Sequence, residues 1–225
     1  MNEITITGSE GLVGSALCDY FQKKNIVVNK LDLKLGHDLS DEKFVKNWFK
    51  ENKTKNLINC FAINDHVNSD REITNLFDFP LETFSEYMKI NVVTLFSVCR
   101  EFARNNDDGS IINFSSTYGL VSPNPKLYEN SNKHIGYGVS KESVINLTKY
   151  LAIHLAPKIR VNCLVPGGIE NNQSAEFVKK YSELTPMKRM MEKNELNGLV
   201  QYLCSDNSSY MTGSVLVCDG GYTSW

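Results

Sequence analysis

The chain has 225 residues, of which 41% are hydrophobic and 22% charged, and its formal net charge is −2. This length suits one large α/β domain over residues 1–225, and the composition is ordinary for a globular protein. The charge balance provides no basic surface for nucleic acid, and no apolar run reaches the roughly 18 residues that a membrane-spanning helix requires. The cysteines form no C-x-x-C pair and the histidines show no ligand spacing, so we expect a cytoplasmic protein without a metal site.

Strand-like and helix-like patterns alternate along the whole chain. MNEITIT at the N-terminus is typical of a strand and lacks the basic and long apolar regions of a signal peptide. Short apolar runs predict strands over 3–7, 26–32, 56–60, 110–116, 159–165 and 214–218. Apolar residues at helical spacing predict helices over 12–24, 40–51, 81–104, 136–156 and 192–204. This alternation predicts a single-domain, Rossmann-type α/β fold, a doubly wound parallel sheet of six to seven strands with helices on both faces.

A glycine-rich stretch, Thr7-Gly8-Ser9-Glu10-Gly11-Leu12-Val13-Gly14, lies between the first predicted strand and helix. Glycines at 8, 11 and 14 permit a tight turn and a close approach of the backbone to a pyrophosphate. The free N–H groups and positive dipole end of the helix then face the phosphates. The alternative is a tight turn without a ligand.

Asp32 follows the second strand, where an acid can accept hydrogen bonds from ribose hydroxyls and repel a 2′-phosphate. It favours NAD, although Lys30 and Lys34 beside it leave NADP open. The alternative is that Asp32 is a solvated loop acid.

Tyr137 and Lys141 stand four residues apart in the predicted helix over 136–156, which places them on one face. A free phenol has a pKa near about 10, and a nearby ammonium group lowers that pKa. Such a pair can exchange a proton with a carbinol oxygen while a hydride moves to or from a nicotinamide. Without other motifs, a tyrosine and a lysine at this spacing could equally lie on the exposed side of an amphipathic helix.

The ordered set of motifs resembles the short-chain dehydrogenase/reductase family over nearly the whole chain. The matching pieces are TGSEGLVG, Asp32, Asp38-Leu39, INCFA at 58–62, Asn91, INFSS at 112–116, Tyr137 with Lys141, RVNCLVPGGIEN at 160–171 and MTGSVLVCDGGY at 211–222. A weaker similarity connects the loop after 112–116 and the ending DGGYTSW with family members linked to bacterial surface-sugar or flagellin-glycan assembly.

The resemblance implies roles for individual residues. Tyr137 would be the acid/base, Ser116 would hold the substrate oxygen, Lys141 would bind the nicotinamide ribose, and Asn91 would hold a water of a proton relay. Ser115 is the alternative to Ser116. The cofactor contacts would come from Gly8, Ser9, Gly11, Leu12, Val13, Gly14, Asp32, Asp38, Leu39, Asn59, Tyr137, Lys141, Pro166, Gly167 and Ile169.

The sequence departs from the family pattern at four places. The glycines are spaced G-x-x-G-x-x-G, and the segment usually written N-N-A-G has Cys60 and the bulky Phe61. The threonine often found after the P-G pair is replaced, so Asn171 or Ser174 would have to substitute for it. Twenty residues separate Ser116 from Tyr137, which indicates an insertion beside the substrate.

Two polar segments, 117–135 and 167–190, follow strand ends, where such folds bind ligands. We expect their side chains to form a polar pocket for a polyol, sugar or sugar phosphate. We also expect residues 117–135 and 170–190 to close over this pocket. Phe177, Val178 and Tyr181 would form a short amphipathic helix that acts as a lid. The alternative is a solvated loop. The candidate pocket residues are Tyr118, Asn124, Lys126, Tyr128, Asn130, Asn132, Lys133, His134, Asn171, Asn172, Gln173 and Lys179.

The predicted function is an NAD(P)-dependent oxidoreductase that interconverts an alcohol and a ketone on a sugar-like substrate. The alternatives are a catalytically silent nucleotide sensor or scaffold, and a cofactor-recycling sugar epimerase or dehydratase. We expect a homotetramer or homodimer through the helices at 81–104 and 136–156. The apolar residues expected at the interface between subunits are Phe84, Tyr87, Met88, Val92, Leu95, Phe96, Val98, Val144, Leu147, Leu151 and Leu155.

Overall fold

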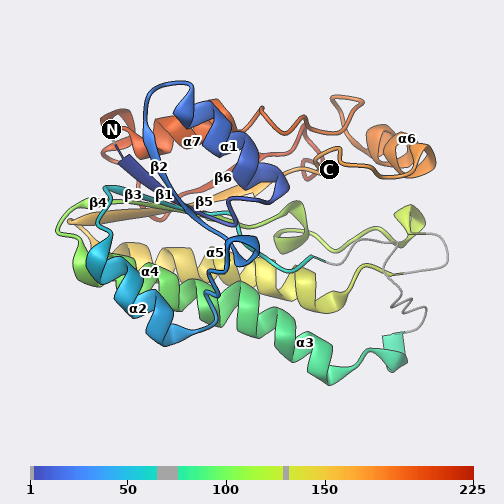
Figure 1. Cartoon of the computed structure of the whole chain (residues 1–225). Helices are drawn as coiled ribbons and strands as arrows, with labels where there is room; N and C mark the ends of the chain where they lie inside the picture. Colours follow the sequence, from blue (N-terminus) through green and yellow to red (C-terminus); the bar gives the residue numbers. More distant parts are fainter. Residues whose placement is uncertain (1–2, 65–75, 129–131) are drawn as a thin grey trace.

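A sheet of six parallel strands forms the centre of the structure, a computed structural model that describes residues 3–64, 76–128 and 132–225. The strands lie in the order β2-β1-β3-β4-β5-β6 (Figure 1). Their bounds are β1 Glu3–Thr7, β2 Val27–Leu31, β3 Asn56–Asn59, β4 Gly109–Phe114, β5 Ile159–Pro166 and β6 Val215–Cys218. The predicted strands and the doubly wound sheet are confirmed.

The strand order creates a switch point between β1 and β3. The chain passes from β1 outward to β2 and then returns to the other side of β1 to form β3. The connections after β1 and β3 therefore leave the sheet in opposite directions, which opens a crevice at the carboxyl ends of these strands. The candidate cofactor residues follow these strands.

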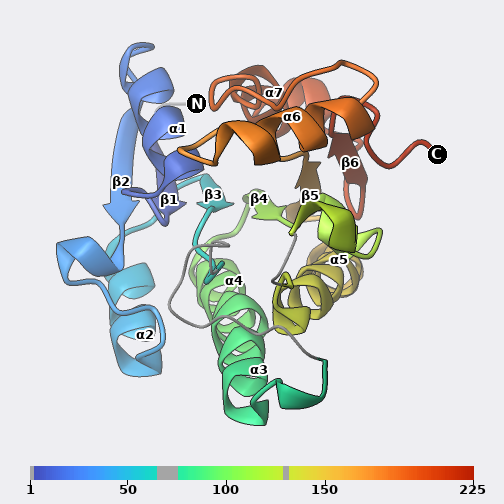
Figure 2. The same ribbon diagram turned by 90° about the vertical axis from the view of Figure 1, so that its right-hand side faces the viewer.

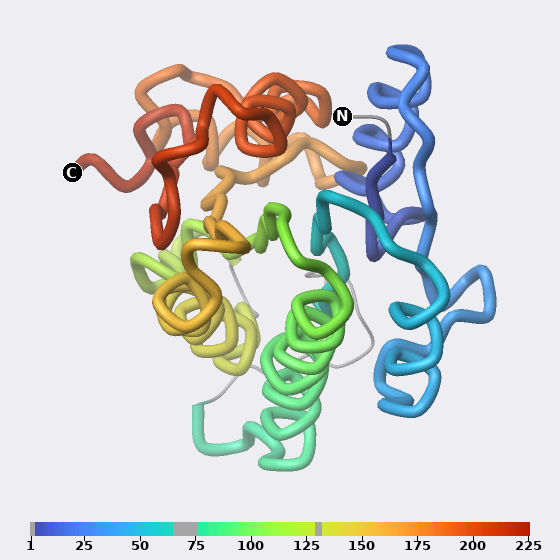
Figure 3. The backbone as a smooth tube through the Cα atoms, turned by 90° about the vertical axis from the view of Figure 1, so that its left-hand side faces the viewer, coloured from blue at the N-terminus to red at the C-terminus, as the bar shows by residue number. Residues whose placement is uncertain are grey.

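Two helical layers cover the sheet, as the end-on views of Figures 2 and 3 show. One layer contains α1 (Leu12–Gln22) and α7 (Asn197–Cys204), with α6 (Ala175–Leu184) beyond the strand ends. The other contains α2 (Glu42–Glu51), α4 (Leu95–Asn105) and α5 (Ile135–Leu155), and α3 (Leu81–Met88) leads into α4. The helix predicted over 81–104 is interrupted by a π-helical turn, Lys89–Thr94. Within the described residues, no helix is long and apolar enough to cross a membrane.

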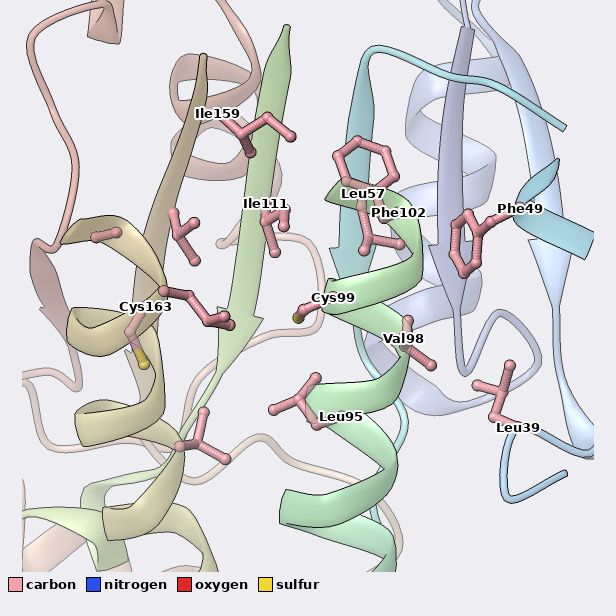
Figure 4. Close-up of a cluster of buried hydrophobic side chains, with 14 of the residues drawn as sticks. Leu39, Phe49, Leu57, Leu95, Val98, Cys99, Phe102, Ile111, Ile159 and Cys163 are labelled. Carbon is pink, nitrogen blue, oxygen red and sulfur yellow. The ribbon is translucent and has the colours of Figure 1, made fainter. Parts of the chain in front are cut away.

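Neighbouring residues of the central strands face opposite layers. Leu57 and Ile111 pack with α2, α4 and α5 (Figure 4), whereas Ile58 and Ile112 pack with α1 and α7. Side chains alternate across a strand, so a strand covered on both faces needs apolar residues at successive positions. This requirement explains why these strands are short continuous apolar runs in the sequence.

A row of buried polar side chains crosses the sheet on the face that α4 and α5 cover. The Thr7 hydroxyl donates to Asn59 Oδ1 at 3.1 Å, and Asn59 Nδ2 donates to Asn113 Oδ1 at 2.9 Å. Asn113 Nδ2 then donates to Thr148 Oγ1 at 3.0 Å. We call these four residues the polar ladder. Because a buried polar group is costly when unpaired, the ladder ties β1, β3, β4 and α5 to one register.

The apolar side chains expected to contact a partner chain lie largely inside the monomer. Tyr87, Leu95, Val98, Val144 and Leu151 are buried against the sheet or the neighbouring helices, so they are not available for association. Phe96 of the expected set is exposed, as are Val93, Tyr150 and Ile153 on the same helices and the turn before α4.

We expect Thr148→Val to lower the free energy of unfolding by about 1–3 kcal/mol, because the buried Asn113 amide loses its acceptor while the side-chain volume is kept. Urea denaturation would measure this loss. A double-mutant cycle with Asn113→Ala separates the hydrogen bond from other effects. Equal stability of Thr148→Val and the wild type would contradict a stabilising role for the ladder.

Candidate active site

The glycine turn between β1 and α1 depends on residues without a side chain. Gly8 has a φ of +65°, and a Cβ atom there would lie 2.5 Å from the backbone nitrogen of Phe61. A Cβ atom on Gly14 would lie 2.0 Å from the carbonyl oxygen of Gly8. The turn thus packs against the end of β3, and the first turn of α1 packs against the glycine turn.

The start of α1 fits a group with phosphate oxygens. Gly11 precedes the helix, no side chain caps it, and no acidic residue occupies its first turn, which includes Leu12 and Val13. Its first backbone N–H groups are therefore available to an anion. Among the described residues, the buried hydroxyl of Ser9 has no hydrogen-bond partner, which also fits an acceptor supplied by a ligand.

Asp32 is fixed beside this turn. Its carboxylate accepts the backbone N–H groups of Glu10 and Lys34, each at 2.9 Å. The Lys30 ammonium pairs with the Glu10 carboxylate at 3.4 Å, and the Lys34 ammonium donates to the Glu10 carbonyl at 3.5 Å. Both lysines that left NADP open are thus engaged by Glu10, and the Glu10 carboxylate adds negative charge to this end of the crevice.

Three other candidate cofactor residues have their side chains engaged elsewhere. The exposed Asp38 carboxylate accepts the backbone N–H of Ser40 at 2.9 Å and its hydroxyl at 2.7 Å, which lowers the pKa of Asp38. Leu39 is buried in the core, and Asn59 belongs to the polar ladder. The side chains of Leu39 and Asn59 therefore support the wall of the crevice.

Tyr137 lies at the start of α5, beside the two serines that follow β4. The Ser116 side chain lies close enough to the phenol, which is 9% exposed, to lower its pKa, and Ser116 Oγ accepts the Tyr118 N–H at 3.2 Å. The Ser115 hydroxyl instead donates to the Lys141 carbonyl at 2.6 Å, and this contact is buried. The geometry therefore brings Ser116, and not Ser115, to Tyr137.

Lys141 is buried below the phenol. Its ammonium donates to the Phe114 carbonyl at 2.9 Å and lies 5.7 Å from the centroid of the Tyr137 ring. Burial lowers the pKa of Lys141 to about 8. Burial raises the pKa of Tyr137, and the nearby Ser116 side chain offsets only part of that rise. In this state desolvation raises the pKa of Tyr137, contrary to the expectation that Lys141 brings it below its ordinary value.

Asn91 occupies the π-helical turn and connects two parts of the site. Its amide nitrogen donates to the Ser140 hydroxyl at 3.0 Å and to the Ile63 carbonyl at 3.1 Å, and its oxygen accepts the Ile63 N–H at 2.9 Å. Asn91 thus holds the segment after β3 against α5, next to Tyr137. Such π turns occur often at functional sites. The sequence contained no signal for the turn, because the apolar spacing continues through it.

The P-G-G segment closes the far side of the crevice. Pro166 ends β5, and Gly167 donates to the Cys218 carbonyl at 2.9 Å. A Cβ atom on Gly167 would lie 2.9 Å from Asp219 Cα, so the segment packs directly on the C-terminal tail. Ile169 packs against the core on the α1 side. Ser174 caps α6 through the Phe177 N–H at 3.1 Å, so its hydroxyl already serves the helix.

Sequence reasoning missed a third apolar cluster over this end of the sheet. The hydroxyls of Tyr118 and Tyr128 bond to each other at 2.7 Å, Tyr181 stacks on Tyr222 at 4.9 Å, and the Tyr181 hydroxyl accepts the Gly168 N–H at 2.6 Å. This tyrosine cluster joins the segment after β4, the predicted lid helix α6 and the C-terminal tail. Tyr118 and Tyr128, expected as polar pocket groups, therefore bond within it. Asn130 lies outside the described residues.

Comparisons with known proteins identify the family to which the sheet and the candidate site belong. A family model described as Enoyl-(Acyl carrier protein) reductase matches residues 21–223. The crystal structure of a short chain dehydrogenase from Leptospira borgpetersenii with bound NAD+ has a TM-score of 0.86 and 31% identity, covering 99% of this chain and 92% of that one.

Two curated proteins are also similar. The post-translational flagellin modification protein A of Campylobacter coli is 27% identical over an alignment that covers 97% of each protein. The ribulose-forming D-arabinitol 2-dehydrogenase of Candida tropicalis is 37% identical over 161 residues, 66% of this chain, and the chain spans only 55% of that protein. Because the family model matches most of this chain and a 31% identical structure covers nearly all of it, the chain belongs to the short-chain dehydrogenase/reductase family.

Proposed function

We propose that this protein is an NAD-dependent oxidoreductase that interconverts an alcohol and a ketone on a polyol or sugar-like substrate. The observation that carries the proposal is the convergence of Tyr137, Ser116 and Lys141 at the carboxyl ends of the strands, where the glycine turn also lies. A nicotinamide, when bound there, would accept or supply the hydride.

Each of the three residues has a distinct task in this proposal. Tyr137 exchanges a proton with the substrate oxygen through its phenol. Ser116, which lies beside that phenol, holds the substrate oxygen in place. Lys141 supplies positive charge that favours the phenolate, and its position is fixed by the Phe114 carbonyl. Asn91 orients the helix that carries Tyr137 and Lys141 through its bond to Ser140.

The preference for NAD over NADP follows from the charges around Asp32. The carboxylates of Asp32 and Glu10 lie at the place where an adenosine ribose would bind, and both repel a 2′-phosphate. The similar Leptospira protein was crystallised with NAD+, which supports the same choice. NADP would have to displace Lys30 or Lys34 from Glu10.

The substrate class rests on the relatives and on the polar residues near the site. One relative acts on D-arabinitol and another modifies flagellin, and both names are compatible with a carbohydrate. Asn132, Lys133, Asn171 and Asn172 provide polar groups next to the elements that form the site. A polyol or sugar offers hydroxyl groups that such side chains can bind.

We expect Tyr137→Phe to lower kcat for polyol oxidation by about 10²–10⁴-fold, because the proton acceptor is lost and the ring still packs. Nicotinamide absorbance would be followed over a panel of polyols, sugars and sugar phosphates, and NAD(H) binding measured by thermal shift. Ser116→Ala should lower activity without removing cofactor binding. Binding of NAD(H) by the wild type, with no turnover of any compound in the panel, would instead indicate a nucleotide sensor.

We expect Asp32→Ala to reduce the ratio of kcat/KM with NAD to that with NADP by about tenfold or more. The variant loses a ribose acceptor and a charge that repels the 2′-phosphate. Asp41→Ala is the matched control, because it removes a nearby carboxylate that only caps α2. A wild-type protein that prefers NADP would contradict the proposal that Asp32 binds the adenosine ribose and repels a 2′-phosphate.

We also infer that the chain self-associates through the outer sides of α4 and α5, which lie next to each other (Figure 2). Ile153 is 77% exposed, and Tyr150, Phe96 and Val93 are exposed on the same two helices and the turn that precedes them. Ile153→Glu should therefore convert a dimer or tetramer to smaller species in light scattering at micromolar concentration. Leu33→Glu, equally exposed but outside these helices, should leave the mass unchanged. A monomeric wild type would rule out the inference.

A further inference from the structure

Two lysines flank Tyr137 at equal distances in the sequence, Lys133 four residues before it and Lys141 four residues after it. In the structure both ammonium groups lie near the same ring. The Lys133 nitrogen is 4.7 Å from the ring centroid and the Lys141 nitrogen is 5.7 Å from it. The cation nearer to the Tyr137 ring is therefore Lys133, to which the reaction scheme above assigns no part in the proton transfer.

The two lysines approach the ring from different environments. Lys141 is buried in α5 and donates to the Phe114 carbonyl at the end of β4. Lys133 is half-buried, immediately before α5, and its ammonium donates to Asn64 Oδ1 in the segment after β3. The bond to Asn64 joins residues 69 positions apart in the chain and holds the Lys133 ammonium against the phenol ring.

We propose that Lys133 is a second cationic group of the acid/base site, which acts through Tyr137 by favouring its phenolate over its phenol. This assignment rests on the proposed function, because it gives Lys133 a task only if Tyr137 exchanges the substrate proton. Lys133 does not have to touch the substrate for this effect.

The physical basis is the electrostatic cost of a buried phenolate. Burial disfavours the charged form of Tyr137, and Ser116 compensates for this only in part. A positive charge at the distance of the Lys133 ammonium stabilises a phenolate more than it stabilises the neutral ring, whose attraction is limited to a cation–π contact. Solvent reaches Lys133, so we expect it to lower the pKa of Tyr137 less than a fully buried partner would.

Other titratable groups surround the same ring. Tyr87 of α3 contacts it edge-on at 6.4 Å, and His134 stacks on Tyr87 at 4.6 Å and accepts the Gly136 N–H through Nδ1. Tyr128, in the segment after β4, is close enough for its own pKa to respond to Tyr137. Together with Lys133 and Lys141, these groups face Tyr137 from the elements packed around it. A test must therefore report on Tyr137 alone.

The test is a single-site titration of residue 137. Position 137 is occupied by 3,5-difluorotyrosine, which is more acidic than tyrosine, and its ionisation is followed by fluorine NMR against pH. The background chains are the wild type, Lys133→Met, Lys133→Arg and Lys149→Met. Lys149 is an exposed lysine of the same helix, three turns beyond position 137, so its variant controls for the loss of one charge.

We expect Lys133→Met to raise the titration midpoint by about half to one pH unit, and Lys133→Arg and Lys149→Met to leave it near the wild-type value. The kinetic test uses chains with an ordinary tyrosine at position 137 and a polyol that the wild type oxidises. At pH values below the midpoint, Lys133→Met should lower kcat/KM by about three- to tenfold. The pH profile of kcat/KM should move to higher pH by about half to one unit. Coincident midpoints for the wild type and Lys133→Met would overturn the proposal.

Two further outcomes also decide the question. Equal shifts in Lys133→Met and Lys133→Arg would overturn the proposal, because they would reflect a changed structure and not a lost charge. A higher KM for acidic or phosphorylated substrates with an unmoved midpoint would overturn it in favour of direct substrate binding by Lys133. The titration needs no substrate. A wild type without turnover would therefore contradict the proposed function, while the midpoints would still decide the electrostatic effect of Lys133.

Discussion

The active site depends on the polar ladder that crosses the sheet beneath it. Thr7, Asn59 and Asn113 each stand near the carboxyl end of a different strand, and Thr148 connects that row to α5. Because an unpaired amide in this position would be costly, the strands and the helix can adopt only one relative register. Tyr137 and Lys141 precede Thr148 on the same helix. Their positions over the strand ends are therefore set by buried hydrogen bonds and not by the exposed loops around them.

Much of the fold was predictable because a doubly wound sheet constrains its sequence strongly. Strands covered on both faces need apolar residues at successive positions, as Leu57-Ile58 and Ile111-Ile112 show. The glycine positions were equally informative, since a side chain at Gly8 or Gly14 would collide with neighbouring backbone. The pairing of Tyr137 with a serine and a lysine followed from motif order. The choice between Ser115 and Ser116 did not, because adjacent residues of similar chemistry differ only in the direction of the side chain.

Features that rest on contacts between distant segments could not be predicted. The tyrosine cluster joins Tyr118, Tyr181 and Tyr222, which lie in three segments far apart in the sequence. Composition alone suggested solvated or mobile loops there, yet stacked rings and paired hydroxyls give these segments a small core of their own. The π-helical turn at Asn91 was hidden for a related reason. The π-helical turn changes the backbone hydrogen bonds of the helix, while the apolar spacing in the sequence continues through it.

Burial of Tyr137 has two opposing effects, and their balance explains the arrangement around the ring. Low solvent access raises the pKa of the phenol, which works against its use as a base. The same low dielectric strengthens the effect of every nearby charge, because Coulomb interactions are screened less away from water. A buried phenol is therefore a poor base by itself but responds strongly to positive charge brought close to it. The ammonium groups of Lys133 and Lys141 lie 4.7 Å and 5.7 Å from the ring centroid, so the site combines exclusion of water with positive charge close to the phenol.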